Sequence, residues 1–281
     1  MSLKSVLCCI KEEVKESIEN RYKRKHIVEL LKQIQFKDIS EFLPSEHFML
    51  SFEPLYAFKR KIQKSNHLNI SNCGDEKLFK LLNFLFEEHY VGRQRLYFSD
   101  FVGVMTSRSS GKYSFSVFKE EQFNMSSSSF KFENYDSLRN NVFSIDGYGS
   151  ANYIKNAIRL NWSNSLYADN IDRSHRFAAL CKWDEVESRH DSELFNVNEI
   201  SINEQNKKQF LENYVCFIVH MKTLSDIMIQ FANVLSFYNP FDTPNSEGDI
   251  AYLIFKRVDK NDEILNVFME EKNCIFINSL L

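Results

Sequence analysis

The chain has 281 residues, 43% hydrophobic and 26% charged, which is ordinary for a soluble globular protein and excludes a wholly disordered one. Its net charge of −3 supplies no overall positive field, so nucleic acid and anionic membranes are not expected partners unless binding is local. Only 7 glycines and 4 prolines occur, which predicts many regular elements and few specialised turns.

The cysteines and the apolar segments exclude several further classes. No cysteine spacing is typical of a zinc site, so reduced thiols and no bound metal are expected at Cys8, Cys9, Cys73, Cys181, Cys216 and Cys274. The N-terminus shows no secretion signal, and the most apolar later segment, Tyr214–Leu235, carries charges that argue against a bilayer span. These features favour a cytoplasmic protein that does not enter a membrane.

Residues 3–36 predict one or two amphipathic helices, because Val6, Ile10, Val14 and Ile18 recur every four residues. A basic run, Arg21–His26, lies on the charged side of this pattern. Glutamates precede it at helical spacing, which favours a solvent-exposed helix face over a site for nucleic acid.

The middle of the chain predicts turns with a short helix or strand over Phe42–Phe58 and a helix over Asp75–His89 that ends before Gly92. Two strand-like runs, Arg95–Met105 and Lys112–Phe118, predict a β-hairpin. A stretch rich in serine and asparagine follows, and we place the one candidate domain boundary there. The prediction is a helix-rich N-terminal region with a hairpin, residues 1–135, and an α/β domain that resembles phosphate-binding domains, residues 140–281.

The second region opens with a predicted strand, Val142–Ile145, a glycine-containing turn, and a helix, Ala151–Trp162. The turn contains Gly147 and Gly149 but lacks the third glycine of the dinucleotide-binding fingerprint. Two interpretations stay open. The glycines let the turn approach a ligand, or they only satisfy a tight turn that needs positive φ.

The next unit predicts a strand, Ser165–Ala168, a polar turn, and a helix that opens at Arg173 with Asp172 as its N-cap. This places three cationic residues in the first helical turn, where the helix dipole is positive and anions are stabilised (Arg173, His175 and Arg176). The neighbouring carboxylates of Asp169 and Asp172 could supply the negative charge, or an external phosphate could.

The stretch Asp172–Ala179 resembles the Asp-Gly-x-His-Arg-x-x-Ala motif of the ParB/sulfiredoxin-like superfamily, and the similarity covers about twenty of the 281 residues. The resemblance implies a nucleotide-phosphate site at the helix start, with His175 and Arg176 as contacts and backbone donors over Asp172–Ser174. Arg173 stands where the motif has glycine. It could offer its guanidinium to the phosphate, or it could mark a lost site.

The rest of the chain alternates strands and helices, so the predicted class is α+β (mixed α/β), with a helical N-terminal region followed by this alternation. The predicted elements are a strand Asn196–Ile202, a helix Glu204–Tyr214, a strand Val215–Val219, a helix Thr223–Phe237, a strand Ile250–Val258, a helix Asp262–Glu271 and a strand Cys274–Asn278.

These observations leave two hypotheses. The first is a nucleotide- or phosphate-binding protein, with a nucleotide and Mg²⁺ as candidate cofactors and phosphotransfer or nucleotide hydrolysis as candidate reactions. Its candidate ligand-binding residues are Asp172, Arg173, Ser174, His175, Arg176, Gly147 and Gly149. The second is a non-enzymatic module that binds a protein partner and whose charged turn is structural. A bacterial toxin or phage-defence component fits either hypothesis, and no catalytic residue is predicted.

Overall fold

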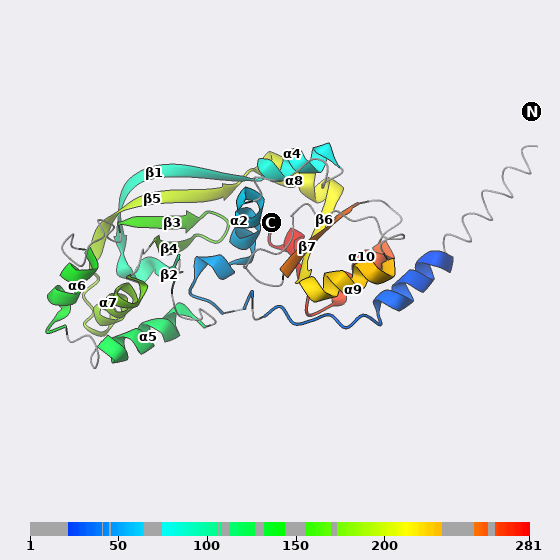
Figure 1. Ribbon diagram of the computed structural model, residues 1–281. Coiled ribbons are helices and arrows are strands. Elements are labelled where there is room, and N and C mark those ends of the chain that lie inside the picture. Colours follow the sequence, from blue (N-terminus) through cyan, green and yellow to red (C-terminus); the bar gives the residue numbers. More distant parts are fainter. Residues whose placement is uncertain are drawn as a thin grey trace, which may run out of the picture. The chain divides into compact units, whose positions relative to one another are not determined.

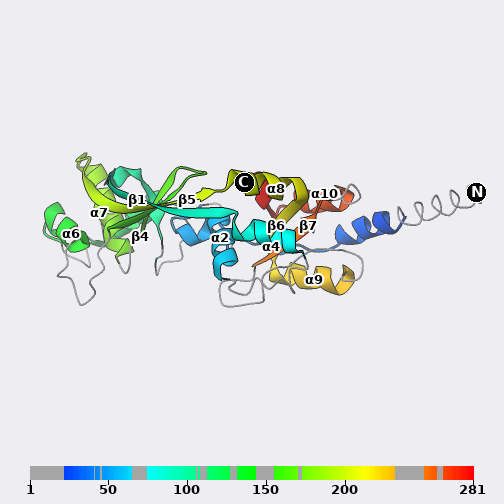
Figure 2. The same cartoon turned by 90° about the horizontal axis from the view of Figure 1, so that it is seen from above.

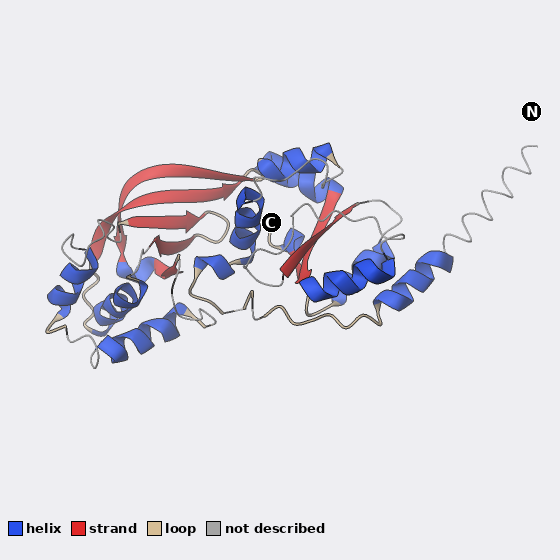
Figure 3. Ribbon diagram, viewed as in Figure 1, coloured by secondary structure: helices blue, strands red, loops and turns tan. Residues whose placement is uncertain are grey.

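The computed structural model describes residues 22–40, 42–44, 46–64, 75–105, 107, 113–126, 132–143, 155–169, 173–231, 250–257 and 262–281. The chain forms two compact units, Met1–Ile39 with Leu211–Leu280 and Ser40–Phe210 with Leu281. The boundary expected between residues 135 and 140 lies inside the second unit. A five-stranded mixed sheet and a three-stranded antiparallel sheet, each accompanied by helices, confirm the α+β class (Figures 1 and 3).

The first unit joins the N-terminal helix, described over residues 22–31, to the C-terminal elements. These are β6 (Tyr214–His220), α9 (Met221–Phe231), β7 (Ile250–Lys256), α10 (Asp262–Glu270), β8 (Ile275–Phe276) and the 3-10 turn η3 (Ile277–Ser279). Strand β6 is central in the order β7-β6-β8 and is buried up to its last residue, as its apolar run predicts. Ile27 and Leu31 complete the core, while Lys23 and Lys25 are exposed.

The second unit is built around the five-stranded sheet, with strand order β1-β5-β3-β4-β2. Pairs β3–β5 and β2–β4 are parallel, whereas β1–β5 and β3–β4 are antiparallel. In chain order its elements are η1 (Leu50–Phe52), α2 (Pro54–Lys64), α4 (Glu76–Asn83), β1 (Phe86–Tyr97), η2 (Phe98–Asp100), β2 (Phe101–Val104), α5 (Phe115–Ser126), α6 (Tyr135–Phe143), β3 (Asn156–Leu160), β4 (Ser165–Asp169), α7 (Ser174–Val186) and β5 (Ser192–Ile202). Helix α8 (Glu204–Asn213) then leads from the second unit into the first.

The two faces of this sheet are covered differently. Side chains alternate between faces along a strand, so Ala157 faces one side and Ile158 the other. The first face packs under α5, α6 and α7, which lie together on one side of the sheet in Figure 1. The second face carries a smaller cluster, to which η1 and α2 contribute Leu50 and Tyr56. The paired strands β1 and β5 are the longest strands of this sheet (Figure 2), and β5 contributes Ile200 to that cluster.

Three element predictions between residues 112 and 162 are wrong. The predicted strand at Lys112–Phe118 overlaps the start of helix α5, so there is no hairpin with it, and β2 pairs with β4 instead. The predicted strand at Val142–Ile145 begins in the last turn of helix α6, which buries Tyr135, Leu138 and Val142 at helical spacing. The predicted helix Ala151–Trp162 contains strand β3, whose buried residues are consecutive because both faces of a central strand are covered.

The prediction for Asp75–His89 is correct only for its first half. Asp75 caps α4 by accepting hydrogen bonds from the backbone N–H groups of Lys77 and Leu78. The helix ends at Asn83, and β1 begins three residues later. Gly92 does not terminate a helix. It lies within β1 at a register shift with φ of 97°, a conformation that favours glycine.

Candidate anion site at the start of helix α7

The strand and the helix predicted within residues 165–183 are both present. Strand β4 runs from Ser165 to Asp169, and α7 begins at Ser174 with Arg173 in the N-cap position, one residue later than expected. Arg173 has φ of −124° and ψ of 15°, so the residue that replaces the motif glycine needs no positive φ. The other candidate residues Asp172, Gly147 and Gly149 lie outside the described residues.

The topology places the start of α7 at the carboxyl edge of two parallel strands. Val104 ends β2 and Asp169 ends β4, and these strands pair in parallel. Strand β3 runs antiparallel to β4, so Asn156 at its start lies opposite Asp169. Ligands of α/β proteins commonly bind outside the carboxyl ends of parallel strands, so this edge of the sheet is a candidate position for a ligand site.

The guanidinium of Arg173 is committed to helix α6. The side chain is 5% exposed, and its Nη1 donates hydrogen bonds to the carbonyl oxygens of Asn141 at 2.9 Å and Val142 at 2.8 Å. These carbonyls belong to the last turn of α6, where helix carbonyls lack intrahelical partners and a cation interacts favourably with the dipole. The described contacts of Arg173 therefore make it a cap for α6, and its guanidinium is not presented to a phosphate.

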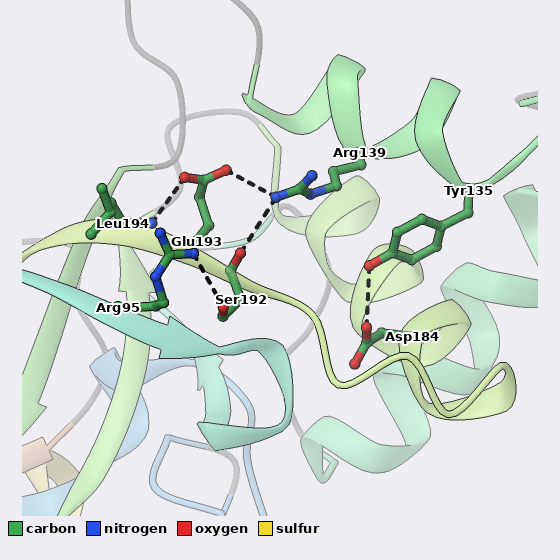
Figure 4. Close-up of polar contacts among 7 residues, drawn as sticks. All are labelled: Arg95, Tyr135, Arg139, Asp184, Ser192, Glu193 and Leu194. Atoms are coloured by element: carbon green, nitrogen blue, oxygen red, sulfur yellow. Dashed lines mark hydrogen bonds and ion pairs between the residues drawn. The ribbon is translucent and has the colours of Figure 1, made fainter.

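Helix α6 is itself fixed to α7 and β5, as Figure 4 shows. The hydroxyl of Tyr135 donates to Oδ1 of the buried Asp184 at 3.2 Å, and burial with this neighbouring carboxylate raises the pKa of Tyr135. Arg139 donates through Nη2 to Oε2 of Glu193 at 3.3 Å and to the carbonyl of Ser192 at 3.4 Å. The carbonyls that hold Arg173 consequently sit on a helix anchored at two further points.

His175 and Ser174 also face neighbouring segments. The Nδ1 of His175 lies 2.7 Å from Oε1 of Gln122 in α5, and the imidazole meets the edge of the Phe118 ring at 5.3 Å between centroids. Gln122 is 6% exposed, so this hydrogen bond satisfies a buried amide oxygen. Ser174 is buried, and its hydroxyl lies 3.5 Å from that of Ser107. Both residues contribute to packing in the described structure.

Both predicted contact residues, His175 and Arg176, have partly exposed side chains. Burial lowers the pKa of the Arg173 guanidinium, and the positive charge of Arg176 lowers it further. The first turn of α7 contains no acidic residue. Both guanidinium groups lie at the positive end of a helix, where the dipole stabilises an anion.

Asp169 does not serve as the counter-charge of Arg173 through any described hydrogen bond or ion pair. Burial raises the pKa of its carboxyl group, and a hydrogen bond from the Asn156 side chain partly offsets the shift. Its described partner therefore lies on the neighbouring strand, and the expectation that Asp169 neutralises the first turn of α7 gains no support from these contacts.

Other chemistry near the helix is limited among the described residues. Cys181 is 1% exposed in the core, where burial raises the pKa of its thiol, as a packing role predicts. Cys181, Cys216 and Cys274 are free thiols, and the described part of the chain holds no group of three or more metal-ligating side chains. No described helix is long and apolar enough to cross a membrane.

No model of a known protein family matches the chain, and no curated protein or solved structure matches it significantly. The resemblance to the ParB/sulfiredoxin-like motif thus stays a prediction. Gln122 and the α6 carbonyls, which hold His175 and Arg173, were missed by sequence reasoning. They lie at least 31 residues away along the chain, and no local pattern signals such contacts.

Proposed function

We propose that the start of α7 binds a phosphate-bearing ligand such as a nucleotide with Mg²⁺, with Arg176 and the backbone N–H groups of the first turn as donors. The observation that carries this proposal is the proximity of Arg173 and Arg176 at the positive end of α7, in a first turn without an acidic residue. An anion would relieve the repulsion between the two guanidinium groups and would gain from the helix dipole.

The roles of the cationic residues differ from those implied by the sequence motif. Arg176 is assigned to the ligand, while Arg173 positions the turn by holding the end of α6. His175 is oriented by Gln122 through Nδ1, which directs its other ring nitrogen away from that hydrogen bond. The proposal concerns binding. The described part of the first turn offers donors and no carboxylate, so phosphotransfer and hydrolysis are not assigned.

A second candidate function is a non-enzymatic module in which the charged turn is structural. The internal contacts of Arg173 and His175 favour it, because they engage both side chains within the protein. The two candidates differ in what they require of Arg176.

A thermal-shift experiment tests the proposal. Melting temperatures are measured for wild type, Arg176→Gln and Arg257→Gln with ATP, GTP, ADP and inorganic phosphate, each with and without Mg²⁺. Arg257 is an exposed cation of the first unit, so its variant matches the loss of charge. We expect at least one phosphate compound to stabilise wild type and Arg257→Gln, with binding to Arg176→Gln weaker by roughly ten- to a hundredfold. Indifference of all three proteins to millimolar ligand would favour the structural module.

A further inference from the structure

The second face of the five-stranded sheet has an open part beyond the cluster formed with α2. We call it the open face. Its side chains come from β1, β5 and β3, and the register of the paired strands puts them on one side. It comprises Tyr90, Arg93, Arg95, Tyr97, Leu194, Asn196, Asn198 and Asn156.

A bulge in β1 makes this arrangement possible. Tyr90 and Arg93 are three residues apart and would point to opposite faces of a regular strand. The register shift between Tyr90 and Gly92 adds one residue, so that Tyr90 pairs with Asn198 and Arg93 with Asn196, two residues apart on β5. Tyr90, Arg93, Arg95 and Tyr97 therefore form a single row along β1.

The cations of this row lack carboxylate partners in the part of the chain that the structure describes. No ion pair or hydrogen bond of the described residues involves the Arg93 side chain, and Arg95 contacts only the hydroxyl of Ser192, at 3.5 Å (Figure 4). Several other cations of the second unit are paired with carboxylates, as in Lys59–Glu88, Lys182–Glu120, Arg139–Glu193, Arg159–Glu199 and Arg189–Glu187. The open face is thus positive although the chain as a whole carries a net charge of −3.

Two exposed tyrosines flank the arginines. Tyr90 is 63% exposed and Tyr97 is 49% exposed. The hydroxyl of Tyr90 donates to Oδ1 of Asn196 at 3.3 Å, which restrains the ring over the sheet. Exposed aromatic rings on a sheet surface are suited to stack on unpaired bases, and neighbouring arginines are suited to phosphates.

Asparagine side chains continue the surface across the sheet. Asn196 donates through Nδ2 to Oδ1 of Asn156 at 3.1 Å, and Asn156 lies opposite Asp169, where its side chain hydrogen-bonds the carboxyl group. An amide presents both donors and acceptors, so this row can match the edge of a base. Asp169, at the end of this row of amides, is a carboxylate, and it lies three strands from Arg93.

We propose that the open face binds single-stranded nucleic acid, with Arg93 and Arg95 on phosphates and Tyr90 and Tyr97 stacked on bases. The bases of a duplex are stacked on one another, so the tyrosines could not reach their faces. A neutral carbohydrate could stack on a tyrosine and bond to the amides, but it would leave both arginines without an anion. The combination of unpaired cations with flanking aromatic rings therefore favours an unpaired polynucleotide over a glycan.

Fluorescence anisotropy tests this proposal with labelled single-stranded RNA and DNA of about 12 nucleotides, the matching duplex, and a panel of neutral glycans as competitors. We expect micromolar or tighter binding of a single strand at about 0.1 M salt. Arg93→Gln/Arg95→Gln should raise Kd at least about tenfold and reduce the slope of log K against log salt by about 1.4, the value for two phosphate contacts. Tyr97→Ala should weaken binding about fivefold or more, whereas Tyr97→Phe should retain it.

Lys23→Gln/Lys25→Gln is the charge-matched control, because both lysines are exposed on the N-terminal helix of the first unit. This variant should bind like wild type. The proposal is overturned by the absence of single-strand binding at about 0.1 mM protein, by equal affinity for the duplex, by competition from a neutral glycan, or by variants of the open face that bind like wild type.

Discussion

The start of α7 and the exposed row of β1 both carry two arginines close together, yet the surroundings of these arginines differ. Arg173 is buried and donates to two carbonyls, whereas Arg93 is exposed and has no partner among the described residues. The sequence motif drew attention to the first pair, and no motif marks the second. The arginine inside the recognisable motif, Arg173, stabilises the fold, whereas Arg93, which lies in no motif, is exposed to solvent and available to a ligand.

This difference has an energetic origin. A buried guanidinium must have its donors satisfied, since an unpaired charge in the interior costs several kcal/mol, so the fold supplies carbonyls to Arg173. An exposed guanidinium is hydrated and can stay unpaired at little cost. The stability of the fold should therefore respond to one arginine and not to the other.

The largest expected effect is on the fold itself. Arg173→Ala removes two charge-assisted hydrogen bonds and leaves the carbonyls of Asn141 and Val142 without them. We expect the free energy of unfolding to fall by about 3 kcal/mol, which corresponds to a decrease in Tm of roughly 6–12 °C. Calorimetry or denaturant unfolding measures the change.

Arg93→Ala is the comparison for that experiment, and its effect should stay within about 0.5 kcal/mol because no described hydrogen bond or ion pair is lost. If both variants lose similar stability, the distinction between a structural and an available arginine fails. If neither does, the Arg173 cap on α6 contributes nothing to the fold.

A smaller effect is expected for the contact between α7 and α5. His175→Ala removes the hydrogen bond to Gln122 and the ring contact with Phe118, leaving a buried amide oxygen without this partner. The expected loss is about 1–2 kcal/mol. A double-mutant cycle with Gln122→Ala should show a coupling energy of at least about 0.5 kcal/mol, whereas strictly additive effects would assign His175 to the ligand site alone.

Sequence reasoning located elements well where one pattern dominated. The buried strand β6 and the amphipathic helix α9 were recognised because one hydrophobic pattern, a continuous apolar run in β6 and a helical period in α9, dominates each segment. It failed at α6 and β3, because Val142-Phe143 is too short to distinguish helix from strand, and Ala157-Ile158 is buried on both faces of a central strand. Tertiary contacts decide such segments.

The same difference applies to the candidate site, whose local elements could be predicted from the sequence and whose long-range contacts could not. The order of β4 and α7 follows from local signals, since a short apolar run and the start of a helix lie close together in the sequence. The partners of Arg173 and His175 come from α6 and α5, and nothing near residue 173 specifies them. The unpaired arginines of β1 depend on a bulge and on strand register, which likewise become visible only in the fold.

The smallest expected effect concerns Asp169, which lies between the two regions. Burial raises the pKa of its carboxyl group above the ordinary value of 3.8, so the folded state favours the protonated form. The stability that the folded state gains from binding this proton is fully present below pH 3.8. It is lost as the pH rises through the higher pKa of the folded state.

At pH 7 the ionised Asp169 carboxylate therefore opposes folding. Asp169→Asn should raise the free energy of unfolding there by less than about 1 kcal/mol, because solvent screens a partly exposed group. Asparagine keeps an oxygen that can accept the hydrogen bond from Asn156, so the gain should vanish when both proteins are unfolded in denaturant near pH 3.5. A loss of stability at pH 7 would instead mean that the carboxylate is stabilised by a cation, and the first turn of α7 would then have the internal counter-charge that its described contacts do not provide.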